Sequence, residues 1–130
     1  MKSFKKGILA LGLTLGIIAS VGGAAFAGST SHGIVNGFLA TAKSNINYDK
    51  GSAYTQYEIA GGAEVYSYYY YINPTTGYVG RMIKQYGGIK YARVEFAAPK
   101  NCRSLQINSS HKLSAYGEKW SANTTATYDS

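Results

Sequence analysis

Tyrosine offers the most obvious binding chemistry in this sequence: thirteen occur in 130 residues, four of them consecutive at positions 68 to 71. A tyrosine ring presents a broad surface for stacking, loses little rotamer entropy and carries a hydroxyl that tolerates water. Successive residues of a β-strand point to opposite faces, so at most half of these rings can face one core. We therefore expect the strand that contains them to be aromatic on both faces.

Alternation divides this strand into two sets of side chains. The sets are Tyr66, Tyr68, Tyr70 and Ile72 on one face, and Val65, Ser67, Tyr69 and Tyr71 on the other. We predict that the Val65 set faces the core, since Val65 and Val79 across the hairpin are both apolar. Tyr78, Lys84 and Tyr86 on the next segment are expected to widen the outward surface. The candidate binding residues are therefore Tyr66, Tyr68, Tyr70, Tyr78, Lys84 and Tyr86.

Two other arrangements would leave no binding surface on this strand. It could be a central strand whose second face is covered by the N-terminal segment, or an edge strand that self-associates. If the outward face is free, a sugar ring, a peptide or a lipid headgroup would each fit it.

Residues suited to catalysis are sparse and scattered. Glu58 and Glu95 could meet across a sheet as the paired carboxylates of a glycosidase, but strand glutamates are more often solvent-facing charges. Cys102 with His111 could form a nucleophile and base, yet no nucleophile motif surrounds Cys102, and a half-buried small residue at a strand start is the simpler interpretation. We therefore expect no enzymatic activity, and a small secreted hydrolase is disfavoured.

Cofactor and metal motifs are missing from the sequence. It contains no C-x-x-C or H-E-x-x-H spacing and no glycine-rich phosphate loop, so we expect no metal site and no cofactor. With Cys102 as the single cysteine, no intrachain disulfide can form.

The N-terminal segment 1–27 has the organisation of a secretory signal peptide. Lys2, Lys5 and Lys6 precede an uncharged stretch that ends in the small-x-small pattern at 25–27. We expect cleavage after Ala27 and release of one domain, 28–130, outside the cell. Cleavage would remove three lysines and lower the net charge from +7 to +4, with the remaining cations spaced singly. That charge favours anionic envelope surfaces and does not indicate nucleic-acid binding.

The pattern of apolar residues predicts an all-β domain. Residues 52–128 alternate in short segments separated by turn signals, which predicts one antiparallel β-sandwich or small barrel of six to seven short strands. Residues 28–46 show a helical stripe instead, with Ile34, Val35, Phe38, Leu39 and Ala42 at suitable spacing. We expect a short N-terminal helix or arm there.

These expectations together describe a secreted, non-catalytic binding protein that acts on an extracellular or cell-envelope component. The expected partner is a cell-wall polymer, a glycolipid or a membrane surface, and a bacteriocin-like antimicrobial action is one specific form of this hypothesis. The alternative is a protein-directed module, such as an inhibitor or host-interaction factor, that presents the loop at 73–77 or the tyrosine strand to another protein.

Overall fold

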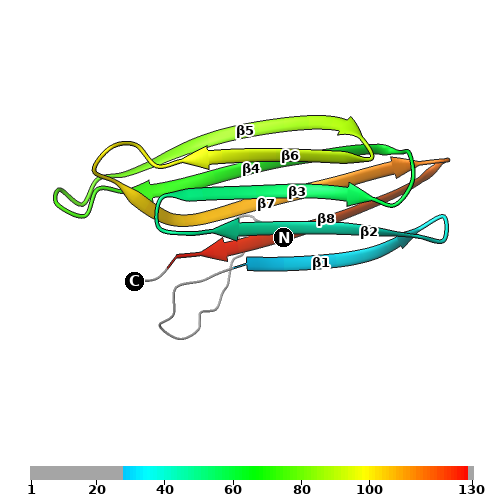
Figure 1. Ribbon diagram of the computed structural model, residues 1–130, viewed down its shortest axis with the longest axis horizontal. Coiled ribbons are helices and arrows are strands. Elements are labelled where there is room, and N and C mark those ends of the chain that lie inside the picture. The colour runs from blue at the N-terminus through cyan, green and yellow to red at the C-terminus, as the bar shows by residue number, and fades with distance from the viewer. Residues whose placement is uncertain (1–27, 129–130) are drawn as a thin grey trace.

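The computed structural model describes residues 28–128, which form strands and turns and contain no helix (Figure 1). The strands are β1 (Gly28–Val35), β2 (Phe38–Ile46), β3 (Lys50–Tyr57), β4 (Gly62–Ile72), β5 (Val79–Ile89), β6 (Tyr91–Ala97), β7 (Arg103–Ala115) and β8 (Glu118–Thr127). The prediction of an all-β fold is confirmed. The described residues form eight strands, not the predicted six to seven. The N-terminal segment adds two strands, and the alternating segments 103–109 and 111–117 belong to one strand, β7.

The strands form two antiparallel four-stranded sheets that face each other in a sandwich-like arrangement. One sheet has the order β1-β2-β3-β6 and the other the order β5-β4-β7-β8. We call them the β3 sheet and the β4 sheet. β1 lies beside β8 at one side of the molecule and β5 beside β6 at the other (Figure 1).

The N-terminal segment is a β-hairpin, so the prediction of a helix or arm over residues 28–46 was wrong. Asn36 and Gly37 both have positive φ, at 50° and 81°, which is the geometry of a tight two-residue hairpin turn. β2 then buries alternate residues, Ala40, Ala42, Ser44 and Ile46, against the other sheet. The apolar spacing that resembled a helical stripe arises from two strands that meet at this turn. The predicted signal peptide, residues 1–27, lies outside the described residues.

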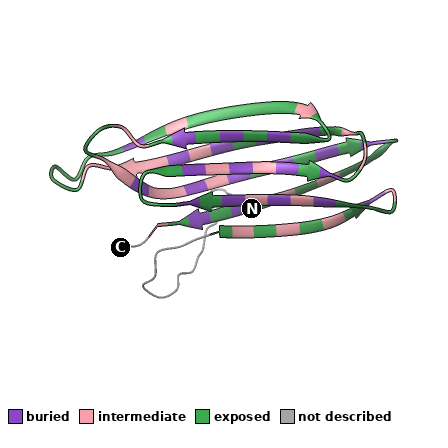
Figure 2. Ribbon diagram, viewed as in Figure 1, coloured by how far each residue is buried: buried purple, intermediate pink, exposed green. Residues whose placement is uncertain are grey.

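The core fills the space between the two sheets and is centred on aromatic stacking. Tyr69 of β4 is fully buried and stacks on Phe96 of β6, with ring centroids 5.1 Å apart and planes 12° apart. Val65, Ile107 and Leu113 extend this cluster along the β4 sheet. Figure 2 shows buried positions alternating with exposed ones along the paired strands, as expected when one face of each sheet is covered.

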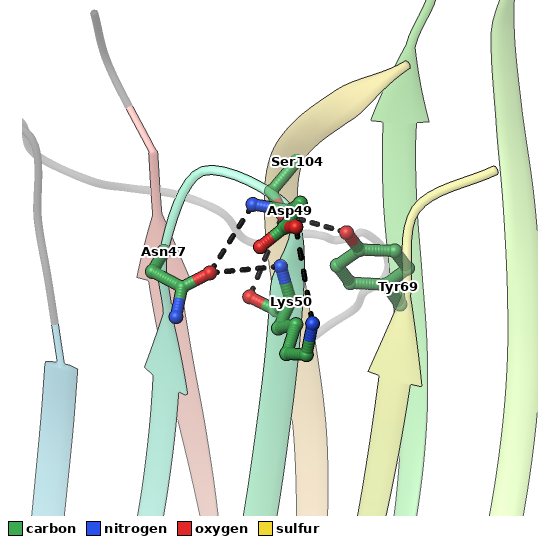
Figure 3. A network of polar contacts seen from close by, with 5 residues as sticks. All are labelled: Asn47, Asp49, Lys50, Tyr69 and Ser104. Carbon is green, nitrogen blue, oxygen red and sulfur yellow. Dashed lines mark hydrogen bonds and ion pairs between the residues drawn. The ribbon is translucent and has the colours of Figure 1, made fainter. Parts of the chain in front are cut away.

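The turn between β2 and β3 is fastened to this core by a polar network (Figure 3). The Asn47 side chain accepts hydrogen bonds from the backbone nitrogens of Asp49 and Lys50, at 3.1 and 2.9 Å. Ser104 then links the backbone oxygen of Lys50 to the Tyr69 hydroxyl, which lies 2.6 Å from Ser104 Oγ. The hydroxyl of the most deeply buried tyrosine of β4 is therefore satisfied inside the protein.

The chain changes sheet between β3 and β4, between β5 and β6, and between β6 and β7. Backbone hydrogen bonds connect the β5–β6 crossing to the β3–β4 crossing. Lys90 N donates to Gly61 O at 2.8 Å, and Lys90 O accepts from Tyr57 N at 2.9 Å. Lys90 has φ of 73° at this corner. Non-local pairs of strands, β3 with β6 and β4 with β7, result from these crossings.

Candidate binding face

β4 is a central strand with one buried and one accessible face. Val65, Ser67 and Tyr69 are fully buried on the inner face. The tyrosine row, which we define as Tyr66, Tyr68 and Tyr70, lies on the outer face, where Tyr66 is exposed and the other two rings are half-buried. The predicted choice of core face is therefore confirmed by the burial of the side chains.

Both arrangements that would have removed this surface are excluded for the described chain. β4 pairs with β5 on one side and with β7 on the other, so it is not an edge strand. Residues 28–46 belong to the opposite sheet and pack against the inner side, so they do not cover the tyrosine row. Among residues 28–128, no element packs over the outer face of β4.

Two of the predicted binding residues, Lys84 and Tyr86, lie on the face opposite to the tyrosine row. In the β4–β5 register, Lys84 is opposite Ser67 and Tyr86 is opposite Val65, and directly opposed residues share a face. The true neighbours of the tyrosine row are Arg81 opposite Tyr70, Ile83 opposite Tyr68 and Gln85 opposite Tyr66. The length of the loop between β4 and β5 explains why the prediction failed. This loop pairs Ile72 with Val79, and Ile72 is on the same face as the tyrosine row, so the odd-numbered residues of β5 point outward.

Lys84 has a structural role at the opening between the two sheets. Its ammonium donates a hydrogen bond of 2.7 Å to the backbone oxygen of Glu95 in β6 and lies 5.3 Å from the centre of the Phe96 ring. Tyr78 lies in the loop before β5, where it is 62% exposed and its backbone oxygen accepts a hydrogen bond from Asn73. The predicted set of six residues therefore separates, and Tyr66, Tyr68 and Tyr70 stay together.

The tyrosine row is fixed by contacts between its own members. The Tyr66 and Tyr68 rings meet edge to face, with centroids 5.3 Å apart, and Tyr66 donates a weak hydrogen bond of 3.4 Å to the Tyr68 hydroxyl. This hydrogen bond, followed by partial burial, raises the pKa of Tyr66 above its ordinary value. The guanidinium of Arg81 lies 5.2 Å from the centre of the Tyr68 ring, within the range of a cation–π contact.

A second row of polar side chains runs beside the tyrosine row on β7 and β8. This polar ladder consists of Gln106, Asn108, Ser110, Asn123 and Thr125. Asn108 Oδ1 accepts hydrogen bonds from Gln106 at 2.8 Å and from Thr125 at 3.1 Å, and Asn123 Oδ1 accepts one from Ser110 at 3.2 Å. The amide oxygens are used inside the ladder, while the amide nitrogens of Asn108 and Asn123 have no hydrogen-bond partner among residues 28–128.

The outer face is hollowed beside Tyr66. This Tyr66 hollow has a volume of about 270 Å³ and is lined by Glu64, Val65, Tyr66, Gln85, Ser110 and Lys112. The pairing of the strands explains the hollow, because small residues lie opposite larger ones. Ser110 is opposite Tyr66, and Gly87 is opposite Glu64. Except for Tyr66, these residues were not predicted, because their nearness depends on the pairing of β4 with strands on both sides.

The β3 sheet has a shallow hollow of its own, of about 410 Å³, on the face away from the core. Its floor follows the cross-strand row of Asn45, Ser52 and Glu95, in which the serine is the smallest. Arg93 donates a 2.7 Å hydrogen bond to Glu95, and this contact is the main cause of a raised pKa at Arg93. The salt bridge balances the charge of the guanidinium, which makes this hollow less suited to an anionic ligand.

His111 lies at the centre of a buried network of hydroxyl groups that spans the sandwich. Its Nδ1 is 2.9 Å from Thr55 Oγ1, which donates to the Glu64 carbonyl, and its Nε2 is 2.7 Å from Thr124 Oγ1. Nδ1 therefore donates and Nε2 accepts in the neutral ring. Ser44, Ser67 and Ser109 continue the network from Thr124. Burial lowers the pKa of His111 to about 4, and a backbone hydrogen bond at Tyr54 opposes the shift.

The fold does not bring together the residues considered for catalysis. His111 is inside the core, and Cys102, half-buried, precedes the first residue of β7. Nine residues of extended strand span roughly 30 Å, too far for a nucleophile and its base. Glu58 follows the end of β3, whereas Glu95 pairs with Ser52 near the start of β3, so these carboxylates are about 20 Å apart along the strand. No group of three or more metal-ligating side chains occurs in the described chain.

Comparison with known proteins gives no relative. No family model, no curated protein and no solved structure matches this chain. Among residues 28–128, no helix has the length and apolar character needed to cross a membrane.

Proposed function

We propose that this protein is a secreted, non-catalytic binding protein that acts on a cell-envelope or other extracellular component through the outer face of the β4 sheet. The observation that carries the proposal is the tyrosine row, three aligned rings on a central strand with no covering element among the described residues. Rings with hydroxyl groups on a rigid sheet bind with little loss of conformational entropy.

Secretion is part of the same proposal. The leader pattern at 1–27 and the mildly basic charge of the remaining chain support export and contact with an anionic envelope. We expect mass spectrometry of culture supernatant to detect a chain that begins at Gly28. Recovery of the product only from membranes, with the leader intact, would contradict secretion.

The binding test is co-sedimentation of the purified mature chain with whole bacteria, scored together with growth inhibition. A double variant, Tyr66→Ser with Tyr68→Ser, should lose most of the binding. The matched control is Tyr54→Ser with Tyr91→Ser, because this second pair lies on the outer face of the β3 sheet with ring centroids 5.6 Å apart. Equal loss in both double variants, or loss in neither, would contradict the assignment to the β4 sheet.

A protein-directed module is the second candidate, and the loop at residues 73–77 is the observation in its favour. The Asn73 side chain accepts hydrogen bonds from the backbone nitrogens of Thr75 and Thr76. Gly77 N donates a hydrogen bond of 2.7 Å to the backbone oxygen of Asn73. The loop is thus exposed and ordered, as a recognition loop requires. Binding that survives the tyrosine double variant but is lost in Asn73→Ala would favour this candidate.

A further inference from the structure

We propose that the ligand of the outer face is a neutral glycan chain, with one sugar unit seated in the Tyr66 hollow and its neighbours lying along the tyrosine row. The inference rests on the proposed function and specifies the chemistry of the ligand. Three features of the described surface carry it: the charge of the hollow, its shape and the donors beside it.

The charge of the hollow balances to zero. Glu64 and Lys112 are directly opposed across β4 and β7, at the same end of the hollow, yet they do not form an ion pair. A phosphate or carboxylate would meet the Glu64 carboxylate, and a cationic ligand would meet the Lys112 ammonium. A hydroxyl group can both donate to the carboxylate and accept from the ammonium, so a neutral polyol satisfies both charges.

The shape of the hollow suits a single ring placed against an aromatic wall. Tyr66 forms one side, while Gly87 and Ser110 leave space on the neighbouring strands. A volume of about 270 Å³ lies just below the usual range for ligand sites, so the hollow can seat one monosaccharide unit and not a drug-sized molecule. The apolar side of a sugar ring can stack on tyrosine while its hydroxyl groups reach the Gln85 amide and the Ser110 hydroxyl.

Donors for the next units of the chain lie along the sheet. Asn108 and Asn123 already use their amide oxygens inside the polar ladder, which fixes their orientation and leaves the amide nitrogens for a ligand oxygen. The middle of the outer face, from Gln85 and Ile83 across Tyr66 and Tyr68 to the polar ladder, is formed by uncharged residues, and the Arg81 guanidinium reaches over the Tyr68 ring, 5.2 Å from its centre. An extended neutral polymer therefore meets aromatic rings on one side and amide donors on the other.

The test is an NMR titration of the ¹⁵N-labelled mature chain with chitohexaose and with cellohexaose as probes. We expect shift changes at residues of the Tyr66 hollow and about tenfold weaker binding in Tyr66→Ala, because one lost stacking ring with its hydrogen bonds is worth about that factor. Tyr91→Ala, on the outer face of the β3 sheet, should bind like the parent. Shift changes that cluster on the β3 sheet would overturn the assignment.

A second variant fills the hollow and keeps the fold. A Cβ at Gly87 would make only ordinary contacts, 3.7 Å from Ala63 O and 3.8 Å from Glu64 Cγ, so we expect the fold to accept Gly87→Thr. Threonine favours strand geometry, so we expect an unchanged melting temperature. Because its side chain narrows the hollow, we expect binding to weaken by about tenfold, the factor expected for Tyr66→Ala. Unchanged binding of both hexasaccharides by Gly87→Thr and Tyr66→Ala would overturn the proposed subsite.

The glycan proposal and the proposed function can fail separately. If bacteria sediment the protein but neither hexasaccharide nor peptidoglycan stripped of anionic polymers binds it, the glycan chemistry is wrong and the proposed function stands. Binding only to phosphatidylglycerol vesicles would likewise contradict the glycan chemistry and would identify a lipid surface. If the sugars bind at Tyr66 but no cell or envelope fraction does, the glycan site stands and envelope binding is wrong.

Discussion

Tyr66 and Tyr69 are on the same strand and have opposite roles because they point to opposite faces. Tyr69 is fully buried, stacks on Phe96 and hydrogen-bonds Ser104, whereas Tyr66 is exposed on the outer face. Burial also raises the pKa of Tyr69, as expected for a hydroxyl in the core.

Alanine at these two positions should therefore give very different stabilities. We expect Tyr69→Ala to lower the free energy of unfolding by about 3 to 5 kcal/mol, the usual cost of removing a fully buried aromatic side chain. Tyr66→Ala should cost less, about 1 to 2 kcal/mol, because its ring is partly exposed on the outer face and is not part of the core. Urea denaturation followed by circular dichroism measures both, and similar costs would mean that both faces of β4 are covered.

His111 should make the fold sensitive to acid. Its pKa is about 4 in the folded protein and about 6.5 in an unfolded chain, so the unfolded state binds the proton first as the pH falls. Stability is therefore complete above about pH 6.5 and decreases through pH 4, by about 3 kcal/mol in total. The groups that contact the ring are the Thr55 and Thr124 hydroxyls and a backbone group of Tyr54, and none of them carries the negative charge that would neutralise an imidazolium.

Denaturant midpoints between pH 4 and pH 7.5 test this dependence. His111→Gln should be less stable than the parent at pH 7.5 and should lose much less stability on acidification. His32→Gln serves as the control, since His32 is exposed on β1, where its Nδ1 lies 3.3 Å from Thr41 Oγ1. A parent protein whose stability is flat across this range would show that the buried imidazole accommodates the proton.

At the scale of elements, β5 is an edge strand that carries several exposed apolar side chains. In the described chain it pairs only with β4, and Val79, Ile83 and Ile89 are 49%, 46% and 79% exposed. Such an edge is a template for pairing with another copy. Lys84 points to the inner face in the middle of this strand and bonds to β6, and an inward charge on an edge strand is a known means of blocking that pairing.

Replacing this lysine should promote self-association. We expect Lys84→Val to shift sedimentation velocity profiles toward dimers and larger species, because the charge that opposes edge pairing is lost. Lys43→Val on β2 is the control, since β2 is paired on both sides. If Lys84→Val sediments like the parent while Lys43→Val associates, Lys84 is not the residue that prevents pairing at the edge of β5.

The sequence predicted strands well where one face is buried and failed where the spacing was ambiguous. The strand of the tyrosine run was predicted, because its alternating residues lie between a glycine pair and a proline turn, and it is β4 in the structure. The β1–β2 hairpin was missed, although Asn36-Gly37 is a strong hairpin signal, since the apolar residues on either side of a tight turn repeat at helix-like intervals.

The candidate site could be predicted on one strand only. Alternation within β4 placed Tyr66, Tyr68 and Tyr70 outward, but the neighbours across β5 depend on whether the loop shifts the pairing by one residue. That shift moved Lys84 and Tyr86 to the inner face. The contributions of Ser110 and Lys112 come from β7, more than forty residues away in the chain, and no local pattern contains them.

For the whole molecule, the two sheets share one polar as well as one apolar core. Ser44 and Thr55 come from the β3 sheet, while Ser109, His111 and Thr124 come from the β4 sheet. Hydrogen bonds across the interior are directional, so they fix how the sheets are placed on each other in a way that apolar contacts alone do not. Circular dichroism of the mature chain should show β-structure without a helical component, and a helical spectrum would contradict the fold.

The non-local pairing of β4 with β7 also sets the order of events during synthesis. Gly62 pairs with Ser114, so the β4 sheet lacks its central neighbour until the last fifth of the chain has been made. Domains dominated by such pairings fold slowly, in milliseconds to seconds. We therefore expect the growing chain to lack a stable fold until translation is nearly complete, and an unfolded chain is the state that the proposed export would require. A fragment that ends at Pro99, before β7, should show no cooperative unfolding transition.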